Sequence, residues 1–72
     1  MAEDITVGMV FERDGAPHLR WVVEAITQVD GIPHVYVRSL GDRTDVRLLA
    51  STVLGDKHVF RRVQAMGSAV PP

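Results

Sequence analysis

The segment Leu19–Leu40, with the sequence LRWVVEAITQVDGIPHVYVRSL, is the strongest determinant of structure in this chain. Two runs rich in valine, isoleucine and aromatic residues flank the pair Asp30-Gly31. An Asp-Gly pair favours a two-residue hairpin turn, because both central residues of that turn adopt positive φ angles. β-Branched and aromatic residues also pack well on a pleated, half-buried surface. The segment therefore predicts a long antiparallel hairpin.

The size of the chain limits what this hairpin can belong to. Seventy-two residues form one domain at most. A core of this size supplies only about 3–5 kcal/mol of net stability, so small domains commonly add disulfides, a metal or a partner subunit. The sequence contains no cysteine, which excludes disulfides and thiolate metal ligands. We therefore expect a well-packed small barrel, an oligomer or both, without a cofactor.

The charge is balanced, with a formal net charge of −1. Nucleic-acid-binding domains usually carry a basic excess, which is missing here. Lys57 is the only lysine, so arginine predominates among the basic residues. A GC-rich bacterial genome would be sufficient to give this bias towards arginine.

The start of the chain, MAEDITVG, lacks the basic and apolar regions of a signal peptide, and no apolar run reaches the roughly 18–20 residues of a membrane helix. We therefore expect a cytoplasmic protein with no membrane partner.

The remaining pattern predicts five short strands and one helical turn. Ser51 suits a helix N-cap and Gly55 the position after a helix end, and the segment between them is short enough for a 3₁₀ turn. The domain is expected to span 5–63, between a flexible N-terminus at 1–4 and a flexible tail at 64–72. The expected strands are Ile5–Arg13, Leu19–Val29, His34–Leu40, Asp45–Ala50 and Val59–Val63.

Alternation along the hairpin assigns side chains to two faces. In the first strand, Val22 and Ile26 interrupt the alternation, which indicates a bend or a bulge. The residues expected on one face are Leu19, Trp21, Val23, Ala25 and Val29, with Arg20, Glu24 and Gln28 on the other. In the second strand, Val35, Val37 and Ser39 are expected on one side and His34, Tyr36 and Arg38 on the other.

The order of these elements resembles the Src-homology-3-like small β-barrel. The residues that carry the resemblance are the Asp30-Gly31 turn, the strand Asp45–Ala50, the turn Ser51–Leu54 and the strand Val59–Val63. The resemblance covers about residues 5–63 and implies an all-β fold of five strands, closed into a barrel or half-barrel. It implies no particular function, because the acidic aromatic run of proline-rich-peptide binders and a crowded aromatic cage are both missing.

The most distinctive candidate binding set is His34, Tyr36 and Arg38, with Arg20 across the hairpin. Aromatic residues and arginine are enriched at the energetic centres of protein interfaces. The structural alternative is that Tyr36 covers the edge of the barrel while Arg38 extends over it. Both interpretations are compatible with the sequence.

Metal and catalytic sites have weaker support. The spacing of His18, His34 and His58 matches no metal-ligand motif. No nucleophile elbow or glycine-rich phosphate loop is present. We therefore expect no metal and no catalytic residue.

These observations favour a non-catalytic module that binds a protein partner or another copy of itself. The alternative is a nucleic-acid-binding barrel in which Tyr36 stacks on a base. In that alternative, the phosphate contacts come from Arg38 and from the group Arg47, Arg61 and Arg62.

Overall fold

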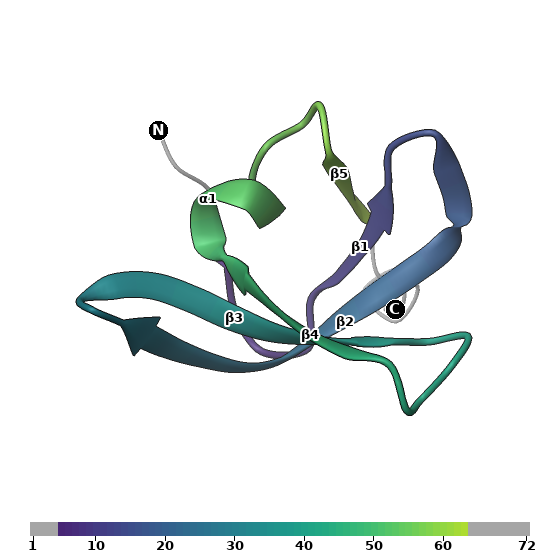
Figure 1. Ribbon diagram of the computed structural model, residues 1–72. Helices are drawn as coiled ribbons and strands as arrows, with labels where there is room; N and C mark the ends of the chain where they lie inside the picture. Colours follow the sequence, from purple (N-terminus) through teal and green to yellow (C-terminus); the bar gives the residue numbers. More distant parts are fainter. Residues whose placement is uncertain (1–4, 64–72) are drawn as a thin grey trace, which may run out of the picture.

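The structure is a computed structural model that describes residues 5–63. It is all-β, with one antiparallel sheet of five strands and one short helix (Figure 1). The strands follow the spatial order β4-β3-β2-β1-β5. The elements are β1 (Val10–Arg13), β2 (Ala16–Val29), β3 (Ile32–Ser39), β4 (Val46–Ala50), α1 (Ser51–Leu54) and β5 (Phe60–Val63).

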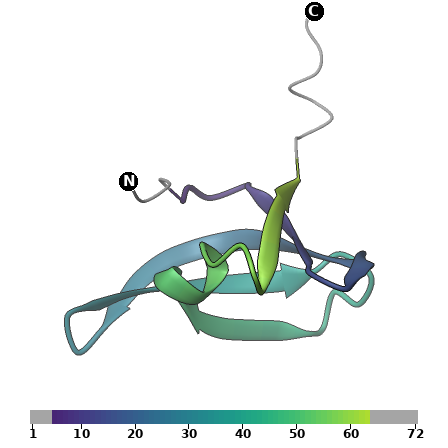
Figure 2. The same ribbon diagram turned by 90° about the horizontal axis from the view of Figure 1, so that it is seen from above.

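The hairpin predicted around Asp30-Gly31 is confirmed. Asp30 has a φ angle of 52° and Gly31 a φ angle of 79°, as a two-residue turn with two left-handed positions requires. Strands β2 and β3 pair from Val29 opposite Ile32 as far as Trp21 opposite Ser39. The closed end of this hairpin projects beyond the rest of the sheet (Figures 1 and 2).

The first strand is shorter than predicted, and the second is longer. Gly8, with a φ angle of 99°, lies in a turn in which the Met9 amide donates to the Thr6 carbonyl, so β1 begins only at Val10. The Asp14-Gly15 turn is tight enough for β2 to begin at Ala16 rather than at Leu19.

The interruption predicted in β2 is a bulge at Glu24. Val23 lies opposite Val37 and Ala25 opposite Tyr36, so Glu24 is the extra residue. An extra residue shifts the alternation by one position for the rest of the strand. The expected faces were therefore wrong beyond the bulge: Ala25 and Val29 lie on the side opposite Trp21, and Gln28 lies on the side of Trp21.

The core occupies one face of the sheet, which we call the inner face. Val35 and Val37 of β3 are fully buried there, and Ser39 is buried beside them, as the alternation predicted. The Ser39 hydroxyl accepts hydrogen bonds from the amides of Gly41 and Asp42, which satisfies this buried polar group. Among residues 5–63, the buried apolar residues are Phe11, Trp21, Val23, Val35, Val37, Leu54 and Phe60.

The helical turn before β5 is confirmed in position but is α-helical rather than 3₁₀. The Gly55 amide donates to the Ser51 carbonyl at 3.0 Å, a bond across four residues that is typical of an α-helix. Ala50, rather than Ser51, occupies the N-cap position, and no side chain caps the helix. Its one buried residue, Leu54, fixes α1 to the inner face.

The sheet is open, which corrects the expectation of a closed barrel. β4 and β5 are the two edges, and within residues 5–63 no ladder joins them. Leu54 of α1 and Phe60 of β5 instead pack into the core cluster on the inner face. A half-open sheet with one covered face is the result (Figure 1).

Candidate functional site

The candidate site is built on the face of the sheet that points away from the core, which we call the outer face. Its centre is β3, where strict alternation places His34, Tyr36 and Arg38 on one side. Tyr36 remains 40% exposed, although it lies in an inner strand of the sheet. No described element therefore covers it.

Strand β4 adds an apolar row to this face. Val46 pairs with Arg38 and Leu48 pairs with Tyr36, so these side chains share the side of their partners. Val46 is 41% exposed and Leu48 43% exposed. Alternation along the predicted strand Asp45–Ala50 accounts for the shared side of Val46 and Leu48, but the register that joins this row to Tyr36 required the structure.

Strand β2 completes the outer face through its bulge. Because Glu24 is the extra residue, Ala25 lies opposite Tyr36 and its small side chain leaves the tyrosine ring accessible. Val22 lies opposite Arg38. The outer face is thus an apolar surface over three strands, formed by Val22, Ala25, Tyr36, Val46 and Leu48, with charged groups at Glu24 and Arg38.

Glu24 and Arg38 form an ion pair across the β2–β3 hairpin. The Arg38 Nη2 group donates to Glu24 Oε1 at 3.0 Å, and Arg38 Nε donates to the second carboxylate oxygen. Arg38 Nη1 also donates to the Arg43 carbonyl. Because three of its nitrogen atoms donate hydrogen bonds, the Arg38 guanidinium is held in one orientation on the surface. A partner that contacts it would therefore pay a smaller entropic cost on binding.

The Glu24–Arg38 pair predicts an effect of acid. The hydrogen bonds from Arg38 hold the pKa of the Glu24 carboxyl below its usual 4.5. The pair therefore contributes its full stability above that usual value, and the contribution is lost as the pH falls through the lowered pKa. We expect Arg38→Gln to raise the pKa of Glu24 towards its usual value, as measured by NMR titration of the carboxyl carbon.

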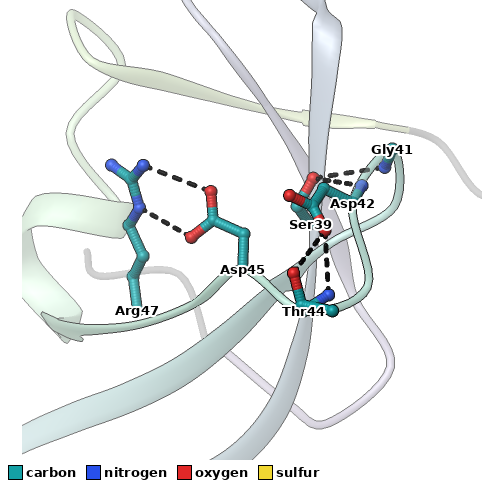
Figure 3. Close-up of polar contacts among 6 residues, drawn as sticks. All are labelled: Ser39, Gly41, Asp42, Thr44, Asp45 and Arg47. Carbon is teal, nitrogen blue, oxygen red and sulfur yellow. Dashed lines mark hydrogen bonds and ion pairs between the residues drawn. The ribbon is translucent and has the colours of Figure 1, made fainter.

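Asp42 provides the internal control for this titration. Hydrogen bonds from the Thr44 hydroxyl and amide lower the pKa of its carboxyl (Figure 3), and neither involves Arg38. The pKa of Asp42 should therefore be the same in Arg38→Gln and in the original chain. An unchanged pKa of Glu24 in this variant would contradict the assigned pairing.

The other two predicted binding residues lie at the margins of the outer face. His34 is half-buried near the hairpin turn, and its Nδ1 atom is 2.8 Å from the Ile32 carbonyl. Arg20 lies opposite Glu12 of β1, with 3.6 Å between its Nε atom and a Glu12 carboxylate oxygen. All four predicted residues are thus on one side of the sheet, with Tyr36 and Arg38 at the centre.

The three arginines of the nucleic-acid alternative do not join this face as one group. Arg47 lies opposite Val37 on the inner face, where its guanidinium is 5.0 Å from the centre of the Trp21 ring. Asp45 accepts two hydrogen bonds from it, at 3.1 and 3.2 Å (Figure 3). Arg61 and Arg62 are on the edge strand β5, at the opposite end of the sheet from β4.

The described part of the chain holds neither a metal-ligand cluster nor a membrane-spanning helix. No group of three histidine, aspartate or glutamate side chains gathers there as ligands around a metal ion would. No helix in residues 5–63 is long and apolar enough to cross a membrane.

Comparison with protein-family models, with curated proteins and with solved structures finds no match for this chain. The chemistry and geometry of its own surfaces are therefore the basis for a functional proposal.

Proposed function

We propose that this protein is a non-catalytic assembly module, and that its outer face binds the outer face of a second copy of the chain. The observation that carries the proposal is the uncovered apolar row of Tyr36, Val46 and Leu48, each about two-fifths exposed on adjoining strands. Contiguous exposed apolar surface on a small domain is typical of an interaction site.

A second copy suits this surface because the surface is self-complementary. A two-fold symmetric interface brings the same patch together from both subunits, so each side must match itself. Apolar residues at the centre meet this condition. The neighbouring Glu24 and Arg38 supply one charge of each sign, so a carboxylate and a guanidinium are available from each subunit. Burial of this face would also add to the small core of the domain.

The order of elements supports one further part of the proposal. A short helix precedes the last strand, and the long hairpin lies between the two edges of the sheet. We propose that the fold is an open relative of the Src-homology-3-like small barrel, in which an exposed sheet face serves for association.

The test is the concentration dependence of mass for the double variant Tyr36→Ser with Leu48→Ser. Sedimentation velocity from micromolar to millimolar concentration should show a monomer–dimer equilibrium in the original chain. The variant should dimerise about tenfold or more weakly, because truncated central interface residues commonly cost about 2 kcal/mol or more.

The matched control is Val7→Ser with Leu19→Ser. Val7 is 61% exposed and Leu19 44% exposed, so the control removes comparable apolar surface elsewhere on the molecule. Its dimerisation constant should equal that of the original chain. A chain that stays monomeric at millimolar concentration would refute self-association, and equal weakening by both double variants would refute the assignment to the outer face.

A further inference from the structure

The inner face carries two hollows that the proposed dimer does not use. The first, of about 380 Å³, lies beside β5 and is lined in part by Phe11, Leu54 and Phe60, with Lys57, Arg61 and Arg62 also on its wall. Phe11 and Leu54 are core residues, so the floor of this hollow is apolar.

The second hollow, of about 210 Å³, lies between β4 and β5. Its apolar wall includes Trp21, Leu49 and Phe60, and its basic residues are Arg13 and Arg47. Phe60 lines both hollows, so they are neighbours on one surface. Their volumes, at or below the lower part of the range for drug-sized ligands, suit one or two apolar side chains each.

The charge around the hollows is one-sided, although the chain as a whole is nearly neutral. Five of the eight basic residues line them, and no acidic residue does. Arg47 and Arg61 are compensated by Asp45 and Asp14 nearby. Within residues 5–63, no carboxylate lies within ion-pair distance of Arg13 or Lys57. Two cations at apolar hollows are thus available to an anionic ligand.

We infer that the two hollows bind an extended acidic segment of a partner protein, with alternate apolar side chains in the hollows and carboxylates on Arg13 and Lys57. In an extended segment, every second side chain points to the same side, which allows two apolar side chains to enter the two hollows. Arginine and lysine at the rim favour carboxylates over neutral groups.

The aromatic residues favour a peptide over single-stranded nucleic acid. Base stacking needs accessible ring faces. Trp21 is 8% exposed and Phe60 7% exposed. Guanidinium groups lie over both rings, with Arg47 at 5.0 Å from the Trp21 centre and Arg13 at 5.9 Å from the Phe60 centre. The faces of both rings are therefore covered, which disfavours base stacking on them.

The experiment uses the full chain and the peptide acetyl-Glu-Glu-Leu-Glu-Leu-Glu-amide. Trp21 is the only tryptophan and borders the second hollow, so its fluorescence reports binding, and amide chemical shifts locate the peptide. We expect saturable binding that is lost when serine replaces both leucines or glutamine replaces all glutamates. The double variant Arg13→Gln with Lys57→Gln should bind about tenfold more weakly, as expected from loss of charge-assisted hydrogen bonds.

The matched control is Arg20→Gln with Arg43→Gln, which removes the same charge from residues that line neither hollow. Its affinity for the peptide should change less than about twofold. Amide spectra establish that each variant is folded. The inference is overturned if the peptide causes no change at millimolar concentration or if the control loses as much affinity. It is also overturned if a ten-nucleotide thymidine oligomer binds with the same dependence on Arg13 and Lys57, which would make this face a nucleic-acid interface.

Discussion

Val35→Asp is expected to unfold the domain at neutral pH. Val35 is fully buried in β3, with Ile26 and Leu49 as its cross-strand neighbours. An ionised carboxylate at this position has no cation on either neighbouring residue. Removing a charge from water without a partner costs several kcal/mol, which exceeds the about 3–5 kcal/mol that a domain of this size holds.

The adjacent substitution Tyr36→Asp is the control. Tyr36 is one residue away and 40% exposed on the outer face, so an aspartate there remains in water. At concentrations low enough to keep the chain monomeric, Tyr36→Asp should retain dispersed amide signals and a cooperative thermal transition, whereas Val35→Asp should lose both. A folded Val35→Asp variant would contradict the division of β3 into an inner and an outer side.

Leu54→Ala is expected to remove most of the stability of the domain. Leu54 is the one buried residue of α1, and it packs into the cluster that includes Phe11 and Phe60. Truncation of a buried leucine to alanine costs about 2–5 kcal/mol. A four-residue helix has no stability of its own, so we expect burial of Leu54 to be the main contribution that holds α1 in place.

Val53→Ala distinguishes loss of the core contact from a change in helix propensity. Val53 precedes Leu54 in the same helix and is 39% exposed. Urea denaturation should give a much lower midpoint for Leu54→Ala and a small shift for Val53→Ala. Equal shifts in the two variants would show that the packing of Leu54 does not hold α1 in place.

The sequence predicted the parts of this fold that depend on local chemistry. The turn at Asp30-Gly31 follows from the positive φ angles that these two residues tolerate. The two sides of β3 follow from strict alternation between Val35 and Arg38. The irregularity in β2 was also visible, because Val22 and Ile26 interrupt the apolar pattern.

The parts that were mispredicted depend on contacts between distant segments. The bulge could be anticipated, but its position at Glu24 is set by pairing with β3, and this position decides the side of Ala25 and Val29. Closure of a sheet depends on how far its edges curl towards each other, which a pattern of period two does not encode. The short helix was assigned the wrong type because four residues are compatible with either hydrogen-bond spacing.

The sequence predicted the central residues of the candidate site but not the strands over which the site extends. Alternation placed Tyr36 and Arg38 together, and the structure agrees. The contribution of Val46 and Leu48 requires the register between β3 and β4, which no local signal specifies. The two hollows were missed altogether, because they bring Arg13 near Arg47 from strands at different positions in the chain.

The open sheet has a consequence for how the protein behaves when concentrated. Strands β4 and β5 each have a neighbour on one side only among the described residues, so their outer backbone groups offer a template for stacking into fibrils. Each of these strands carries arginine: Arg47 in β4, and Arg61 with Arg62 in β5. Charged side chains on an edge strand disfavour its pairing with another chain, so we expect these arginines, together with the carboxylates beside Arg47 and Arg61, to limit growth of the open sheet into fibrils.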